Sequence, residues 1–275
     1  MEFTNMLSIT SDYFESTGDP QPYLKRIAEA GFSHVHWCHE WWSDRLYTLD
    51  EMEQIKGWFL EYGLRLLNLH GSQGQERYWV SHEEAKRLAG IELVQNRIEL
   101  TARLGGEVII MHIPTTAPPE TRPGWLVQIR KSLDDIAPFA NNHSVRLALE
   151  NMIGDDFEML TTLLAEYEPG FLGFCYDAGH ANMGENGLGQ LERLKDRLIA
   201  IHLHDNDGGS DQHKLPFTGT VDWHALTSLL AASAYQECVN LEVHINESGI
   251  ADERQFLREA YLAGEKLTHM IAKNR

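Results

Sequence analysis

Residues 61–67 read EYGLRLL, and a helix end, a glycine and a short apolar strand follow one another in the same order in two other stretches. These are EAGFSHV at 29–35 and LGGEVII at 104–110. In each stretch the glycine ends a region of helical period, because glycine readily adopts the left-handed conformation of a helix C-cap. The repetition predicts βα units around a parallel sheet.

Eight such units can be counted along the chain. The predicted strands are residues 6–9, 33–37, 65–69, 107–111, 145–149, 171–176, 198–203 and 239–243. Eight units in a chain of 275 residues predict a single (β/α)8 TIM barrel domain that spans residues 1–275. A doubly wound open sheet is the competing fold.

Composition narrows the class of partner. The formal net charge is −18, and a field of that sign repels polyanions, so nucleic acid is disfavoured. The three cysteines have no CxxC spacing, which fits reduced thiols and a cytoplasmic protein. We find no signal peptide and no apolar run long enough for a membrane span, so we expect an unprocessed protein without a membrane partner.

Polar side chains of metal-ligand type follow six successive predicted strands. The C-terminal ends of barrel strands carry the active site, so these side chains should meet at one mouth. Each one alone is more typical of a hydrogen-bonded strand cap. Carboxylates that face one another repel, however, and a divalent cation removes the repulsion, so the set predicts a metal site. The six residues are His70, His112, Glu150, Asp177, His204 and Glu242.

The stretch HLHDNDGGSDQH at 202–213 raises the question of a second ion. We expect His204 to be the ligand at the strand end and His202 to point away from the barrel interior. Asp211 and His213 stand two residues apart and can converge on a neighbouring ion, together with His180. A polar loop is the alternative for these three residues.

The ordered motifs LALEN, YDAGH, HLHDN with DQHKLPFTGTVDW, and NLEV resemble the xylose isomerase-like TIM barrel superfamily over nearly the whole chain. This superfamily includes sugar phosphate isomerases and epimerases, tagatose 3-epimerase-like enzymes and endonuclease IV-type AP endonucleases. The epimerase branch implies one Mn²⁺ or similar ion, and the endonuclease IV branch implies three zinc ions. The residues matching the epimerase ligands are Glu150, Asp177, His204 and Glu242, and those matching the additional endonuclease ligands are His70, His112, His180, Asp211 and His213.

Two loops supply candidate substrate contacts. HWCHEWW at 36–42 offers His36 and Trp37, because aromatic walls suit sugar rings, although core packing explains the aromatics equally well. The proline-rich segment 115–125 presents Arg122, which could clamp a phosphate but more often would be a solvated loop arginine.

These patterns lead to a metal-dependent isomerase or epimerase of a free or phosphorylated sugar. Glu150 and Glu242 would remove and return a proton from opposite faces through a metal-stabilised enediolate. The cofactor would be one to three divalent ions per chain, Mn²⁺ or Zn²⁺, with Mg²⁺ and Co²⁺ also suitable. A multinuclear zinc phosphodiesterase, a lyase or dehydratase, and a sugar-binding domain without turnover are the alternatives. The oligomeric state, including a homo-oligomer, stays open.

Overall fold

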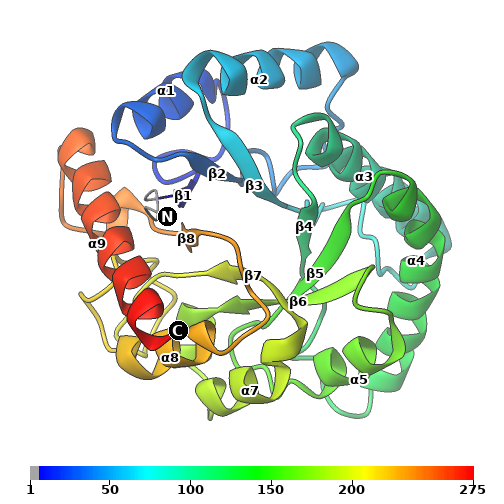
Figure 1. Cartoon of the computed structure of the whole chain (residues 1–275). Coiled ribbons are helices and arrows are strands. Elements are labelled where there is room, and N and C mark those ends of the chain that lie inside the picture. The colour runs from blue at the N-terminus through cyan, green and yellow to red at the C-terminus, as the bar shows by residue number, and fades with distance from the viewer. Residues whose placement is uncertain (1–5) are drawn as a thin grey trace.

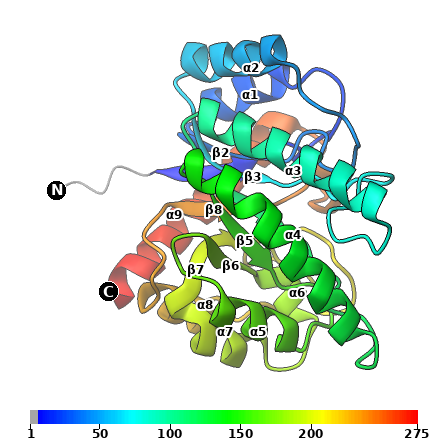
Figure 2. The same ribbon diagram turned by 90° about the vertical axis from the view of Figure 1, so that its right-hand side faces the viewer.

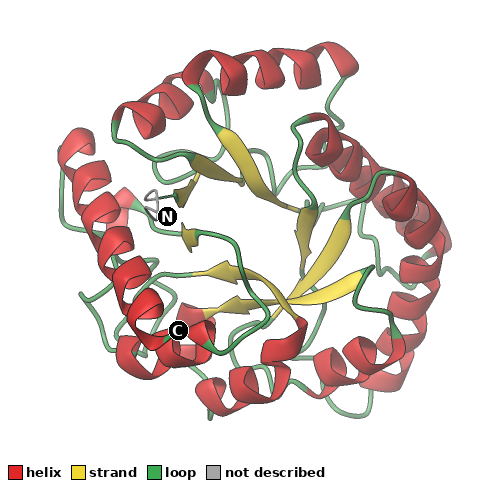
Figure 3. Cartoon of the chain, viewed as in Figure 1, coloured by secondary structure: helices red, strands yellow, loops and turns green. Residues whose placement is uncertain are grey.

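Eight parallel strands form a barrel that a ring of helices surrounds (Figures 1 and 3). The computed structural model describes residues 6–275. The strands are β1 (Leu7–Thr10), β2 (His34–Trp37), β3 (Arg65–His70), β4 (Val108–Met111), β5 (Arg146–Glu150), β6 (Leu172–Asp177), β7 (Leu198–His202) and β8 (Val239–Leu241). Each predicted strand agrees with the observed one to within two residues at both ends.

The strand order distinguishes the barrel from an open sheet. The strands pair in the order β7-β6-β5-β4-β3-β2-β1-β8. A parallel bridge between Leu203 and Leu241 then connects the two ends, with a hydrogen bond of 3.1 Å from Leu203 N to Asn240 O. The predicted TIM barrel is therefore confirmed, and the open-sheet alternative is wrong.

The helices follow the strands as the glycine pattern predicts. Gly63 is the C-cap of α2, with φ 68°, in the left-handed region that a residue with a Cβ rarely adopts. At its other end α2 begins with a capping box between Thr48 and Glu51. The helices are α1 (Gln21–Glu29), α2 (Leu49–Tyr62), α3 (Glu84–Arg103), α4 (Arg122–Asn142), α5 (Glu158–Glu166), α6 (Ala178–Asn182), α7 (Gly187–Leu194), α8 (Trp223–Ala231) and α9 (Glu253–Asn274).

The hydrophobic core has two parts. The larger part fills the layer between strands and helices, and a small inner cluster plugs the barrel. Figure 2 shows the helices α3 and α4 packed along the outside of the strands. None of the helices in residues 6–275 is long and apolar enough to cross a membrane. The inner cluster consists of Val108, Ile110, Ala148, Cys175 and Ala200, with Ile199 packed against it.

The inner cluster determines where the polar side chains point. Alternate residues of a strand face the same side, so the residue two positions after an inward apolar residue also faces inward. Ala148 is followed in this way by Glu150, Cys175 by Asp177 and Ala200 by His202. The layer above the apolar plug is therefore polar and lies at the C-terminal ends of the strands.

Candidate metal centre

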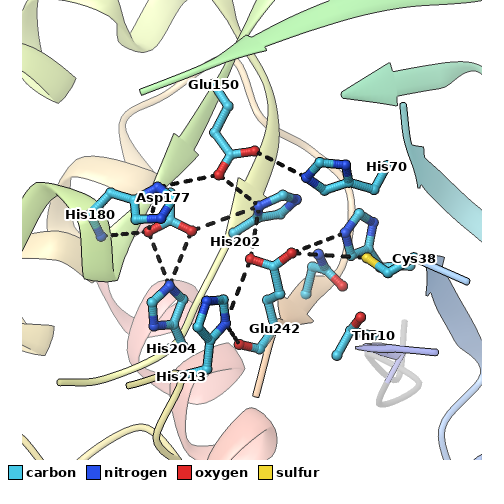
Figure 4. Close-up of polar contacts among 12 residues, drawn as sticks. Thr10, Cys38, His70, Glu150, Asp177, His180, His202, His204, His213 and Glu242 are labelled. Carbon is cyan, nitrogen blue, oxygen red and sulfur yellow. Dashed lines mark hydrogen bonds and ion pairs between the residues drawn. The ribbon is translucent and has the colours of Figure 1, made fainter. Parts of the chain in front are cut away.

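Four ligand-type side chains from four neighbouring strands meet at the centre of the barrel mouth (Figure 4). They are Glu150, Asp177, His202 and Glu242, whose ligand atoms all lie within 4.8 Å of one another. The Nδ1 atom of His202 lies 3.2 Å from Glu150 Oε1, 3.1 Å from Glu242 Oε2 and 3.7 Å from Asp177 Oδ2. One imidazole nitrogen thus faces three carboxylates.

The expectation that His202 points away from the barrel interior is wrong. His202 is fully buried, and it shares the inward face of β7 with Ala200. The spacing of two residues between His202 and His204 indicated that they share one face of an extended strand, but not which face of the strand turns inward. Both histidines are polar residues at the end of β7, so residue type alone did not show which of them joins the central group.

His204 lies one step further out, against Asp177. Its Nε2 atom lies 3.1 Å from both oxygens of that carboxylate. The ring can come this close because residue 179 is a glycine, where a Cβ would overlap the imidazole. Because His204, His213 and Glu242 also bring ligand atoms within 4.8 Å of one another, the role of His204 as a ligand stays a prediction.

Two further groups flank the four central residues. On the β3–β4 side, His112 Nε2 lies 3.2 Å and His70 Nε2 3.8 Å from Glu150 Oε2. On the other side, Asp211 Oδ2 lies 3.2 Å from the Nε2 atoms of both His180 and His213. The structure therefore brings all nine residues of the predicted ligand set into one cluster.

The imidazoles hold the central carboxylates in their ionised form. Burial raises the pKa of Glu150 and Glu242, but the charge of His202 and the hydrogen bonds of neighbouring imidazoles outweigh burial and keep both pKa values well below the usual range. For His213, burial alone would lower the pKa. The hydrogen bond to Asp211 and the nearby carboxylates outweigh burial and raise the pKa to about 9. Within residues 6–275, no lysine or arginine forms an ion pair with Glu150, Asp177 or Glu242.

Of the three predicted substrate contacts, His36 lies at the cluster, whereas Trp37 and Arg122 lie away from it. His36 is fully buried beneath it, 3.4 Å from Glu242 Oε1, with its other ring nitrogen 2.6 Å from Asn68 Oδ1. Trp37 faces the helices, where its ring packs against Phe59. Arg122 begins α4 and forms ion pairs with Asp156 and Glu158, so its charge is already compensated.

The loop after β2 contributes a different aromatic residue to the mouth. Trp41 lies with its ring centroid 4.4 Å from that of His70 and 5.8 Å from that of His112. The stretch HWCHEWW contained this residue, but nothing in the sequence alone decided which tryptophan would face the mouth. Asp12 and His244 lie beside Glu242, with His244 Nε2 3.8 Å from Asp12 Oδ1. No motif or spacing in the sequence marked these two residues as part of the site.

A family model described as "Xylose isomerase-like TIM barrel" matches residues 24–260. The chain belongs to this family. The barrel is 32% identical to an uncharacterised protein of Sinorhizobium fredii over 92% of this chain and 89% of the relative. It is 26% identical to the 3-dehydro-D-guloside 4-epimerase of Escherichia coli over 81% of this chain and 85% of the epimerase.

Other similarities are more distant or shorter. A protein of Staphylococcus saprophyticus named "Probable endonuclease 4" is 27% identical over 54% of this chain and 56% of that protein. Among solved structures, a D-psicose 3-epimerase superposes with a TM-score of 0.78 at 18% identity, over 97% of this chain and 99% of the other. A structure of the IolI protein with a zinc atom superposes with a TM-score of 0.75 at 14% identity, over 98% and 99% of the two chains. At these identities the superpositions show the shared fold.

Proposed function

We propose that this barrel is a metal-dependent epimerase or isomerase that acts on a carbohydrate by removing and returning a proton. The observation that carries the proposal is the group of four buried ligand-type side chains at the mouth, two of which are glutamates on different strands. The similarity to a 3-dehydro-D-guloside 4-epimerase and to the fold of a D-psicose 3-epimerase supports a carbohydrate as the substrate class.

The residues at the mouth fit a divalent cation. Three buried carboxylates without an arginine or lysine partner among residues 6–275 need a positive charge to offset their desolvation. His202 Nδ1 is buried among these carboxylates but forms no hydrogen bond of good geometry with them, as expected of a nitrogen that shares a metal ion with them. A mixed set of imidazole and carboxylate ligands suits Mn²⁺ and Zn²⁺. We propose Glu150, Asp177, His202 and Glu242 as the ligands of this ion.

The chemistry follows from the two glutamates. When bound, the cation polarises a substrate carbonyl and the adjacent hydroxyl, which makes the neighbouring C–H more acidic. Glu150 projects from β5 and Glu242 follows β8, and both are ionised, so each can accept a proton from carbon. Inversion of the carbon requires that one carboxylate removes the proton and that the other, after it has taken up a proton from solvent, delivers that proton to the opposite face. His36 at Glu242 and His112 at Glu150 orient the two side chains.

Exchange of hydrogen with solvent tests this proposal directly. The metal-loaded protein is incubated in D₂O with a panel of ketohexoses and 3-keto-glycosides, and deuterium at carbon is measured by NMR. We expect incorporation into at least one sugar, because the carboxyl group that delivers the new proton has taken it from D₂O. A complete lack of exchange across the panel would reject the proposal.

A multinuclear hydrolase is the second candidate, and one observation favours it. Two additional groups flank the central ligands, His70 with His112 and His180 with Asp211 and His213, as a three-metal site would need. The net charge of −18 argues against a nucleic-acid substrate. We therefore expect no cleavage of duplex DNA with an abasic site on a denaturing gel, and specific incision at that site would favour the hydrolase.

The group around Asp211 makes a separate prediction about metal content. We expect the double variant Asp211→Ala, His213→Ala to lose about one ion per chain in elemental mass spectrometry, because these side chains and His180 form a group of ligand type of their own. The central ligands remain in this variant, so the other metal should stay bound. An unchanged metal count with a raised KM would instead make Asp211 and His213 contacts to substrate.

A further inference from the structure

A hollow of about 490 Å³ opens beside the candidate metal centre, between the loops that follow β1, β2 and β8. Glu242 and His213 form its inner end, and the other lining residues are 12–17, 41–42, His244, Asn246 and Glu247. The volume lies in the range of small-molecule sites. A ligand that reacts at Glu242 would place the rest of its structure in this hollow.

Apart from the imidazoles of His213 and His244, the charged groups that line the hollow are acidic. Beyond Glu242, its lining contains the carboxylates of Asp12, Glu15 and Glu247. None of the lysines or arginines in the described part of the chain lines it. An anionic group at this end of a ligand would meet several like charges, and juxtaposed like charges disfavour binding.

The outer wall of the hollow is aromatic. Phe14 is 40% exposed and Trp42 is 55% exposed, and both line the hollow together with Trp41. The ring centroids of Trp41 and Trp42 lie 4.0 Å apart. Exposed aromatic surface next to hydrogen-bond acceptors suits a molecule with C–H faces and hydroxyl groups.

Asp12 is the carboxylate that is held in one orientation. The hydroxyl of Thr10 donates a hydrogen bond to Asp12 Oδ1, and His244 Nε2 lies 3.8 Å from the same oxygen. The side chain of Asp12 is only 7% exposed. Because both contacts use Oδ1, the second oxygen, Oδ2, is the one that can accept a hydrogen bond from a ligand.

The loops around Asp12 are connected to one another by the backbone. His244 N donates to His213 O at 2.9 Å, and Ile245 N donates to Tyr13 O at 2.9 Å. The ring of His244 also stacks on that of His213, with centroids 4.5 Å apart and an angle of 12° between the planes. A pocket fixed in this way loses little conformational entropy when it binds a ligand.

From these observations we infer that the hollow binds the non-reacting end of an uncharged sugar, with a hydroxyl on Asp12 Oδ2, and excludes sugars that carry a phosphate at that end. The inference rests on the proposed epimerase function, because it assigns the inner end of the hollow to the reaction at Glu242. The substrate class that follows is free sugars and glycosides rather than phosphate esters.

Paired ligands that differ only in the phosphate test the inference. The probes are D-fructose, D-tagatose, D-psicose and a 3-keto-D-glucoside, each with and without a 6-phosphate, and binding to the metal-loaded protein is measured by calorimetry. We expect at least one neutral sugar to bind, and its phosphate ester to bind at least about tenfold more weakly, as like-charge contacts require. Equal or tighter binding of the phosphate ester, or no binding of any neutral sugar, overturns the inference.

Variants connect the preference to named residues. We expect Glu15→Gln with Glu247→Gln to reduce the discrimination against the phosphate ester, and Asp12→Asn to raise the Kd of the neutral sugar about tenfold, as loss of a charge-assisted hydrogen bond predicts. Glu168→Gln, an exposed carboxylate between α5 and β6, is the matched control and should change neither value. Unchanged discrimination and unchanged Kd in the hollow variants contradict the assignment.

The two hypotheses fail in different experiments. A neutral sugar that binds in preference to its phosphate ester, but takes up no deuterium from solvent, rejects the epimerase and supports the assignment of the hollow. Deuterium uptake into sugar phosphates with no preference for neutral sugars supports the epimerase and rejects the assignment.

Discussion

Glu150→Gln and Glu242→Gln should each reduce turnover by a factor of ~10²–10⁴, the range typical of general acid–base groups. An amide has nearly the shape of a carboxylate but cannot accept a proton from carbon. Both side chains lie at the mouth, above the apolar plug, so the barrel core should be unaffected. The measurement is the rate of deuterium incorporation into the sugar that the wild-type protein exchanges.

The controls separate chemistry from folding. Glu168→Gln removes one exposed carboxylate far from the mouth and should keep the wild-type rate. Circular dichroism and the Tm should show that both mouth variants remain folded. If either variant keeps more than about one hundredth of the wild-type rate, the glutamate concerned is neither a proton acceptor nor an essential ligand.

His202→Ala should lose the central metal ion, whereas His204→Ala should keep it with weaker affinity. His202 Nδ1 faces three carboxylates, so its removal deletes one of four ligands. Within the central group His204 makes its hydrogen bonds to Asp177, and loss of such an outer partner weakens metal binding by roughly 10–100-fold. Elemental mass spectrometry after dialysis gives the ion count, and titration against a chelator gives the affinity.

An exposed histidine provides the control for this pair. His224→Ala, on the surface of α8, removes an imidazole without touching the mouth and should keep both the ion count and the affinity. The reverse ranking, with the ion retained in His202→Ala and lost in His204→Ala, would return the ligand role to His204. The two histidines are close enough that only separate variants distinguish them.

Local sequence signals were sufficient to predict the fold. Glycines such as Gly63 end helices through their backbone conformation alone, and short β-branched runs specify strands wherever they occur. The meeting of ligand-type side chains at one mouth was also predictable, because the carboxyl ends of parallel strands lie together in a barrel. Glu150, Asp177 and Glu242 each follow an apolar run directly, so their position along the chain already implied their position in space.

Other features depend on how the strands and loops pack against one another. His202 belongs to the central group because Ala200 lies in the inner plug, and the side that a strand turns inward is decided by its neighbours. Trp37 and Trp41 belong to one short stretch, yet one packs against Phe59 and the other lies beside His70. Asp12 acquires a binding geometry only when the loop after β8 brings His244 beside it. The sequence by itself determined which side chains reach the strand ends, because that is a property of local structure, whereas the tertiary structure decided which of them face one another, because those contacts join segments far apart in the chain.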